Sequence, residues 1–153
     1  APGGRGSLST GVRWTVRPRP DTDGKYGRLE AFNLETKKSL WKMRQRAPMS
    51  TGVLATAGGV VFAGGLDRVL AAYDDATGKE LWRVRLNDVA NSAPISYQVN
   101  GKQYIAVTVG NGGAQAATFP ALVPEIKNPP DRGAAIWVFE LPDRLTNARP
   151  AAR

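Results

Sequence analysis

The sequence predicts an all-β fold, and three observations support that prediction. Short runs of β-branched and aromatic residues recur along the chain, separated by Gly, Asp and Asn, as in strands joined by turns. Almost no segment has the 3.6-residue spacing of an amphipathic helix. A stretch of about 40 residues is also repeated, which indicates that the strands are organised in units.

The chain has 153 residues, of which 42% are hydrophobic, enough for one ordinary core. No window approaches the roughly 20 apolar residues that a membrane span requires. The chain starts APGGRGSLST, with neither an initiator Met nor a signal pattern. We therefore expect a piece of a longer protein.

Strands are predicted wherever a β-branched or aromatic run lies between turn residues. The predicted ranges are 12–16, 28–32, 40–45, 52–56, 60–64, 69–73, 81–86, 94–99, 104–109 and 135–141.

The repeat organises these strands. Residues 31–41 read AFNLETKKSLW and residues 72–82 read AYDDATGKELW, 41 positions later (72 − 31), and VFEL at 138–141 is a third, partial copy. A period near 40 residues that carries four short strands is typical of a β-propeller blade.

The requirements of a tight turn explain which residues the repeat contains. Asp74 can accept backbone N–H groups, Thr77 can add a second local bond, and Gly78 can adopt a positive φ where the hairpin reverses. Trp82 then lies on the outer strand, where it can pack between adjacent blades. The first copy has Lys37 in place of the Gly, so its turn is either strained by about 1 kcal/mol or of another type.

One complete blade is predicted over residues 52–86. A pair of strands ending at Trp41 precedes it, and three strands of another blade follow it. Closed propellers have about four to eight blades, so we predict an incomplete β-propeller of about two to three four-stranded antiparallel blades, with exposed blade faces. The missing last strand indicates the C-terminal part of a ring.

Three regions are expected from this division. Residues 1–25 form a basic, loop-rich lead-in from a preceding blade, residues 26–143 form the C-terminal blades, and residues 144–153 form a flexible tail.

Positive charge is concentrated at the N-terminal end. Residues 1–46 hold 11 Lys and Arg against 4 Asp and Glu, whereas residues 47–142 hold 7 against 8. Such an excess can attract nucleic acid, anionic lipid or an acidic partner. No RNA-binding motif or basic recognition helix accompanies it, so we expect a solvated basic end and no nucleic-acid partner.

The chain contains no Cys and no His. Their absence excludes Cys/His zinc sites, disulfides, haem attachment through CxxCH, Cys nucleophiles and Ser-His-Asp triads within these residues. Catalysis here would have to use Asp, Glu, Lys, Tyr or a bound cofactor.

The turn AxDxxTGKxxW at 72–82 matches the tryptophan docking motif of the pyrroloquinoline quinone (PQQ)-dependent dehydrogenases, which are eight-bladed propellers. The segments RAPMSTGVLATAGGVVFAGGLDRVLAAYDDATGKELW (46–82), SAPISYQVNGKQYIAVTVGNGG (92–113) and VFELPD (138–143) closely resemble the C-terminal blades of the alcohol and glucose dehydrogenases of that class. The resemblance covers roughly residues 26–143.

The resemblance implies an enzyme that oxidises an alcohol or sugar hydroxyl by hydride transfer to PQQ, with Ca²⁺ as Lewis acid and an Asp as general base. It also implies a cytochrome c or ubiquinone as electron acceptor, a periplasmic location and the remainder of the propeller as a partner. The Ca²⁺ ligands and the catalytic Asp lie upstream in such enzymes, so no residue of this segment is predicted to be catalytic or to bind metal. The segment alone is expected to be inactive.

Cofactor contacts within this chain are expected in the loops between the second and third strands of each blade, which in such propellers gather over the quinone. The loops here are GGLDR at 64–68 and GNGG at 110–113, whose glycines allow close backbone approach. The predicted cofactor-binding residues are Asp67, Arg68, Asn111, Gly112 and Gly113. Ordinary turn glycines remain an equal alternative.

The second of these connections spans residues 111–133 and is far longer than a typical loop. At the ligand-facing end it is a candidate lid or pocket wall, with Phe119 and Leu122 as inward apolar groups. The alternative to an enzyme is a non-catalytic propeller scaffold of the outer-membrane assembly type, which uses the same tryptophan turns. The glycine-rich loops favour the enzyme, because a scaffold does not require them.

Overall fold

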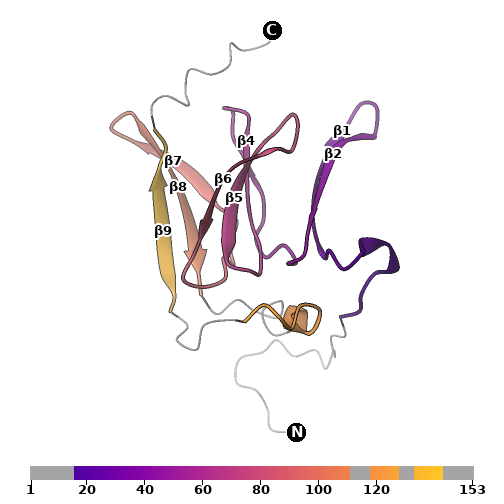
Figure 1. Ribbon diagram of the computed structural model, residues 1–153. Coiled ribbons are helices and arrows are strands. Elements are labelled where there is room, and N and C mark those ends of the chain that lie inside the picture. Colours follow the sequence, from indigo (N-terminus) through magenta and orange to yellow (C-terminus); the bar gives the residue numbers. More distant parts are fainter. Residues whose placement is uncertain (1–15, 111–117, 128–132, 143–153) are drawn as a thin grey trace, which may run out of the picture.

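The computed structural model describes residues 16–110, 118–127 and 133–142. Nine strands in three antiparallel sheets are present in this part of the chain. The sheets stand side by side like neighbouring blades (Figure 1). The predicted all-β, incomplete propeller is confirmed in this respect, because the three sheets do not close into a ring.

The first sheet holds two strands, β1 (Gly27–Asn33) and β2 (Lys38–Gln45). The central sheet is a complete four-stranded blade in the order β3-β4-β5-β6. Its strands are β3 (Leu54–Ala55), β4 (Val60–Gly64), β5 (Val69–Asp74) and β6 (Glu80–Arg85).

The third sheet has the order β7-β8-β9 and lacks a fourth strand among the described residues. Its strands are β7 (Ile95–Val99), β8 (Lys102–Val109) and β9 (Ala135–Glu140). Two short 3-10 helices, η1 (Pro20–Thr22) and η2 (Phe119–Ala121), lie in the connections before β1 and β9.

Nine of the ten predicted strands are present with small differences in their bounds. The strand predicted over 52–56 is reduced to two residues, and Gly52 lies so close to Ala93 that an added Cβ would be 2.9 Å from the Ala93 Cβ. The strand predicted over 12–16 lies almost entirely outside the described residues, as does the predicted tail at 144–153.

The repeat seen in the sequence is also present in the structure. The register of β1 with β2 shifts between Ala31 and Phe32, and that of β5 with β6 shifts at the matching Ala72 and Tyr73. Such a bulge bends and twists the outer hairpin, so both copies of the repeat build the same hairpin.

The turn after β5 has the predicted hydrogen bonds, and the turn after β1 has one bond at the matching place. Asp74 Oδ1 accepts from the Thr77 backbone N–H at 2.8 Å and from the Thr77 hydroxyl at 2.7 Å, and Asn33 Oδ1 accepts from Thr36 N–H at 2.8 Å. Gly78 has φ +71°, and Lys37 has φ +56° at the matching place. Of the two alternatives for Lys37, the structure shows the strained left-handed conformation.

The outer strand of the first sheet docks on the turn of the central sheet. Trp41 donates its indole N–H to the Asp75 carbonyl at 2.6 Å, and a Cβ added to Gly78 would lie 2.6 Å from the Trp41 ring. Gly78 therefore serves twice: it permits the positive φ, and it leaves room for the ring. Trp82 contacts the next sheet through the edge of Phe139, with ring centroids 5.1 Å apart.

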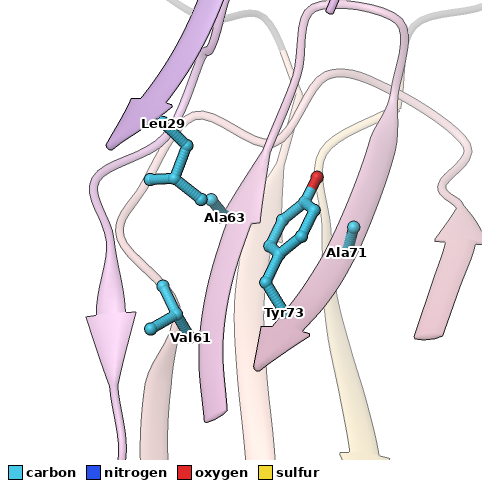
Figure 2. Packing of buried hydrophobic residues seen from close by; sticks show 5 residues of the cluster. All are labelled: Leu29, Val61, Ala63, Ala71 and Tyr73. Atoms are coloured by element: carbon cyan, nitrogen blue, oxygen red, sulfur yellow. The ribbon is translucent and has the colours of Figure 1, made fainter. Parts of the chain in front are cut away.

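The core lies between the sheets, and the two inner strands of the central sheet, β4 and β5, are buried on both faces. Alternate residues of β4 and β5 face opposite neighbours, as period-2 side-chain placement requires. Val61, Ala63, Ala71 and Tyr73 form a cluster with Leu29 of the first sheet, shown in Figure 2. The intervening Phe62 and Ala72 pack with Ile105 of the third sheet.

Large apolar side chains are exposed on both flanking sheets. They are Phe32, Leu34 and Leu40 on the first sheet and its turn, and Ile95, Tyr97, Val99, Ile136 and Val138 on the third. Exposed blade faces were predicted for a partial ring, and apolar surface of this extent is typical of an interface.

The matched turn positions give a paired stability test. Gly78→Ala should destabilise the fold by about 1 kcal/mol for the positive φ, and by more if Trp41 is displaced. Lys37→Gly should stabilise it by about 0.5–1 kcal/mol, because it removes the same strain. Urea denaturation measures both changes, and equal effects of the same sign would contradict this account.

Candidate functional site

The connections between second and third strands and those between sheets lie at one end of the molecule, the lower end in Figure 1. The turn between β4 and β5 is closed by hydrogen bonds from Gly65 N–H to the Val69 carbonyl, at 2.9 Å, and from Arg68 N–H to the Gly65 carbonyl, at 3.0 Å. Arg68 has φ +66°. This turn is the first of the two predicted cofactor loops.

Asp67 and Arg68 have different environments within this turn. Asp67 Oδ1 accepts from Val69 N–H at 3.4 Å and lies within 2.6 Å of where a Cβ on Gly65 would be, so the carboxylate folds back on its own turn. Arg68 makes one long hydrogen bond, 3.4 Å from Nη1 to the Asn87 carbonyl. Of the two side chains, only Arg68 can donate to an anionic ligand, because an ionised carboxylate only accepts hydrogen bonds.

The other three predicted cofactor residues, Asn111, Gly112 and Gly113, lie outside the described residues. Their neighbour Gly110 donates its N–H to the Val89 carbonyl at 3.1 Å and has φ +141°. A Cβ on Gly110 would lie 3.1 Å from the Ala134 Cα. The two ends of the long connection are therefore held close together beside the connection from β6 to β7.

That same connection from β6 to β7 contains a buried acid. Asp88 is 2% exposed; its Oδ1 accepts from the N–H of Val89 at 2.7 Å, and its Oδ2 has no hydrogen-bond partner among the described residues. A buried carboxylate oxygen without a donor is costly. This oxygen is therefore a candidate contact for a group that completes the site.

Residues 118–127 of the long connection form a strap across the end of the molecule that carries these connections (Figure 1). Val123 is fully buried and packs with Leu66 of the β4–β5 turn and with Val89. Phe119 and Leu122, the predicted inward groups, pack against this cluster while remaining partly exposed. The strap therefore joins the third sheet to the turn of the central sheet.

Arg46 fixes the strap to the first sheet. Its Nε donates to Glu125 Oε1 at 2.6 Å and its Nη2 to the Leu122 carbonyl at 3.0 Å, while Nη1 donates to the Gly24 carbonyl at 2.6 Å. The guanidinium also lies 5.0 Å from the centre of the Tyr26 ring. One side chain thus holds segments that are more than 70 residues apart in sequence.

The ion pair has the expected effect on both groups. The hydrogen bond from Arg46 lowers the pKa of Glu125, and the hydrogen bond to Glu125 raises the pKa of Arg46. Both groups are exposed to solvent, so the pair orders the strap without a large gain in stability.

A groove of about 440 Å³ opens between the strap and the residues that precede β1. Phe119 and Leu122 line it together with Tyr26 and Met49. The position of this wall agrees with the predicted role of the long connection as a pocket wall, a role that stays a prediction.

The described residues contain no group of three or more His, Asp, Glu or Cys side chains that could hold a metal ion. They also contain no helix long and apolar enough to cross a membrane.

Comparison with known proteins identifies the architecture. The family model described as "Glucose/ethanol/alcohol dehydrogenase, beta-propeller domain" matches residues 10–105. The chain belongs to this family. The predicted resemblance to the PQQ-dependent quinoprotein dehydrogenases is confirmed.

Individual relatives agree with this assignment. The chain is 39% identical to the quinoprotein alcohol dehydrogenase PedE of Pseudomonas putida over 138 residues, which cover 90% of the chain and 21% of that protein. It is 39% identical to a 1-butanol dehydrogenase (cytochrome c) of Thauera butanivorans over 112 residues, covering 71% and 16%. The chain thus spans about a fifth of the length of the curated relatives it matches.

Solved structures show the same arrangement of strands. The quinohemoprotein alcohol dehydrogenase of Comamonas testosteroni superposes with a TM-score of 0.61 at 31% identity, covering 82% of this chain and 17% of that one. A europium-containing methanol dehydrogenase gives a TM-score of 0.67 at 26% identity, covering 78% and 24%. The three sheets are therefore part of a quinoprotein propeller.

Sequence analysis missed Arg46, Glu125 and the buried Asp88. Arg46 was counted only as part of the basic N-terminal charge, and Glu125 lies in a loop with no periodic pattern. The apolar Leu66 within the otherwise polar loop GGLDR was the one available sign that another segment covers this turn.

Arg46→Lys should loosen the strap, because a Lys cannot donate simultaneously to the carboxylate and to two backbone carbonyls. Hydrogen exchange at the Val123 and Ile126 amides should become several-fold faster, with little change at the central sheet. Arg83→Lys is the matched control, because Arg83 pairs with Glu80 in the same forked geometry, 2.7 Å for each contact, away from the strap. Unchanged exchange in Arg46→Lys would rule out this role.

Acidification should release the strap as well. The pKa of Glu125 is lowered in the folded chain, so the contribution of the pair is complete above the unfolded-state value of about 4.3. It is lost as the pH falls through the lower folded-state pKa. Exchange at Val123 should therefore accelerate below about pH 4, and Glu125→Gln should remove that pH dependence.

Proposed function

We propose that this chain is the C-terminal segment of a PQQ-dependent dehydrogenase that oxidises an alcohol or sugar hydroxyl by hydride transfer to the quinone. The observation that carries the proposal is 39% identity with a quinoprotein alcohol dehydrogenase over 90% of the chain. The tryptophan docking of Trp41 on Gly78 supports the matching architecture.

When bound, PQQ would supply the hydride acceptor and Ca²⁺ the Lewis acid, both implied by the family. The metal ligands and the general base are proposed to lie upstream, as the family resemblance implies. The segment alone is accordingly proposed to be inactive.

The proposed task of this segment is to position the cofactor and to enclose its binding site. Arg68 presents a guanidinium at the ligand-facing end, where it can pair with a carboxylate of the quinone. The backbone at Asn111, Gly112 and Gly113 is proposed to approach the cofactor plane closely. Asp67 holds the shape of the turn, and Asp88 offers one unpaired oxygen to a donor from the cofactor or from another blade.

The partners follow from the same proposal. The remainder of the propeller would cover the exposed faces of the first and third sheets, and a primary alcohol or an aldose would be the substrate. A cytochrome c or ubiquinone would accept the electrons, in a periplasmic location. The names of two relatives include cytochrome c: the 1-butanol dehydrogenase and a lupanine 17-hydroxylase of Pseudomonas sp.

The alternative, a non-catalytic scaffold propeller of the outer-membrane assembly type, has no specific observation in its favour. Tryptophan turns such as that at 72–82 are common to both classes, whereas the family match at residues 10–105 is to the dehydrogenases. Nucleic acid is not proposed as a partner.

The test is reconstitution of the full-length protein with PQQ and Ca²⁺, followed by dye-linked oxidation of primary alcohols and aldoses. We expect turnover that requires the quinone, and about tenfold weaker PQQ binding in Arg68→Gln, because a charged hydrogen bond is lost. Lys79→Gln is the matched control, because Lys79 lies in the turn between β5 and β6, at the other end of β5 from Arg68. This variant should bind PQQ normally.

A folded full-length protein that neither binds PQQ nor turns over would overturn the dehydrogenase proposal. Turnover by the 153 residues alone would overturn the proposal that the segment is inactive.

A further inference from the structure

The groove between the strap and the residues before β1 carries five cationic side chains and an apolar wall. Its cations are Arg17, Arg19, Lys25, Arg28 and Arg44. Its apolar wall includes Tyr26, Met49, Phe119 and Leu122. We propose that this groove is a binding site for an amphiphilic carboxylate, a small molecule with one anionic head and a hydrocarbon or aromatic tail.

Part of the positive charge is neutralised within the fold. Arg19 Nε lies 2.6 Å from Asp21 Oδ1, and Arg44 Nη2 lies 3.9 Å from Asp21 Oδ2. Arg28 and Lys42 share the carboxylate of Glu30. Two carboxylates thus serve four cations.

Arg17 and Lys25 are not neutralised in this way. In the described part of the chain neither side chain has a hydrogen bond or an ion pair, and both line the groove. Residues 1–15 contain two Arg and no Asp or Glu, so they cannot supply the missing anion. A bound carboxylate would therefore find two cationic side chains here that no carboxylate of the described chain already pairs.

The apolar wall selects the kind of anion. Phe119 and Leu122 belong to the strap, which Arg46 and the buried Val123 hold in place. A wall that is already ordered costs little conformational entropy when a ligand binds. A simple inorganic anion would leave this wall in water, whereas a hydrocarbon tail would cover it.

The size of the groove sets an upper limit on the ligand. A volume of about 440 Å³ lies at the lower end of the range for small-molecule sites. It accommodates a carboxylate with a tail of about eight carbons, with the head at Arg17 and Lys25 and the tail along Phe119 and Leu122.

Calorimetric titration of the full-length protein with octanoate, 1-octanol and acetate tests the proposal. Octanoate should bind, and both controls should bind at least about tenfold more weakly, because each lacks one half of the recognition. Raising the salt concentration from about 0.05 to 0.5 M should weaken octanoate binding. The measurement needs neither quinone nor turnover, so its outcome is independent of the proposed function.

Two variants separate the two halves of the site. Arg17→Gln/Lys25→Gln should reduce octanoate affinity about tenfold or more, and Phe119→Ala should reduce it without affecting acetate. Lys37→Gln/Lys38→Gln is the matched double variant, because it removes two charges from the turn at the opposite end of the first sheet. Thermal unfolding of each variant confirms that it is folded.

Three results would overturn the proposal. Octanoate binding that is unchanged in Arg17→Gln/Lys25→Gln would exclude the cationic head site. Equal binding of 1-octanol would show an apolar surface without anion selectivity. Tighter binding of a poly-glutamate peptide than of octanoate would indicate an acidic protein partner in its place.

Discussion

Burial of the two inner strands of the central sheet, β4 and β5, on both faces is the constraint on which the other features depend. Because successive residues of β4 and β5 point to opposite neighbours, both sets must be apolar or small, which explains the continuous runs VVFAG and VLAAY. The apolar side chains on both faces can be buried only if a blade lies on each side of the sheet. The docking of Trp41 against Gly78 and the contact of Trp82 with Phe139 fix the spacing of those blades at their outer edge.

The blade was predictable from sequence because its signals are local. Strand alternation and the Asp74 turn each depend on residues only a few positions apart, and the same local pattern recurs 41 positions away. Lys37 shows where local signals were insufficient: its left-handed conformation was one of two alternatives that the sequence left open, and the structure decides between them. Gly52, at the start of the strand predicted over 52–56, lies against Ala93, a neighbour distant in sequence that no local signal indicates.

The candidate site was less predictable because it is built from contacts between loops. The glycine-rich loop at 64–68 was identified from its composition, but the different environments of Asp67 and Arg68 depend on the fold of the turn and on Asn87. The contacts of Arg46 with Leu122 and Glu125 join segments with no shared pattern. No single-sequence periodicity encodes such a pairing, because neither partner lies in a regular element that fixes its direction.

Blade docking and loop packing therefore make separate contributions to this end of the molecule. The tryptophan contacts lie at the outer edge and would hold neighbouring sheets together whatever the connections contained. The strap contacts the turn of the central sheet through Val123 and the first sheet through Arg46, so it links three sheets at the end of the molecule where the connections lie. A substitution in the strap can accordingly alter the shape of the groove and of the neighbouring turns while the sheets remain intact. This separation allows one propeller frame to carry different ligand preferences in its connections.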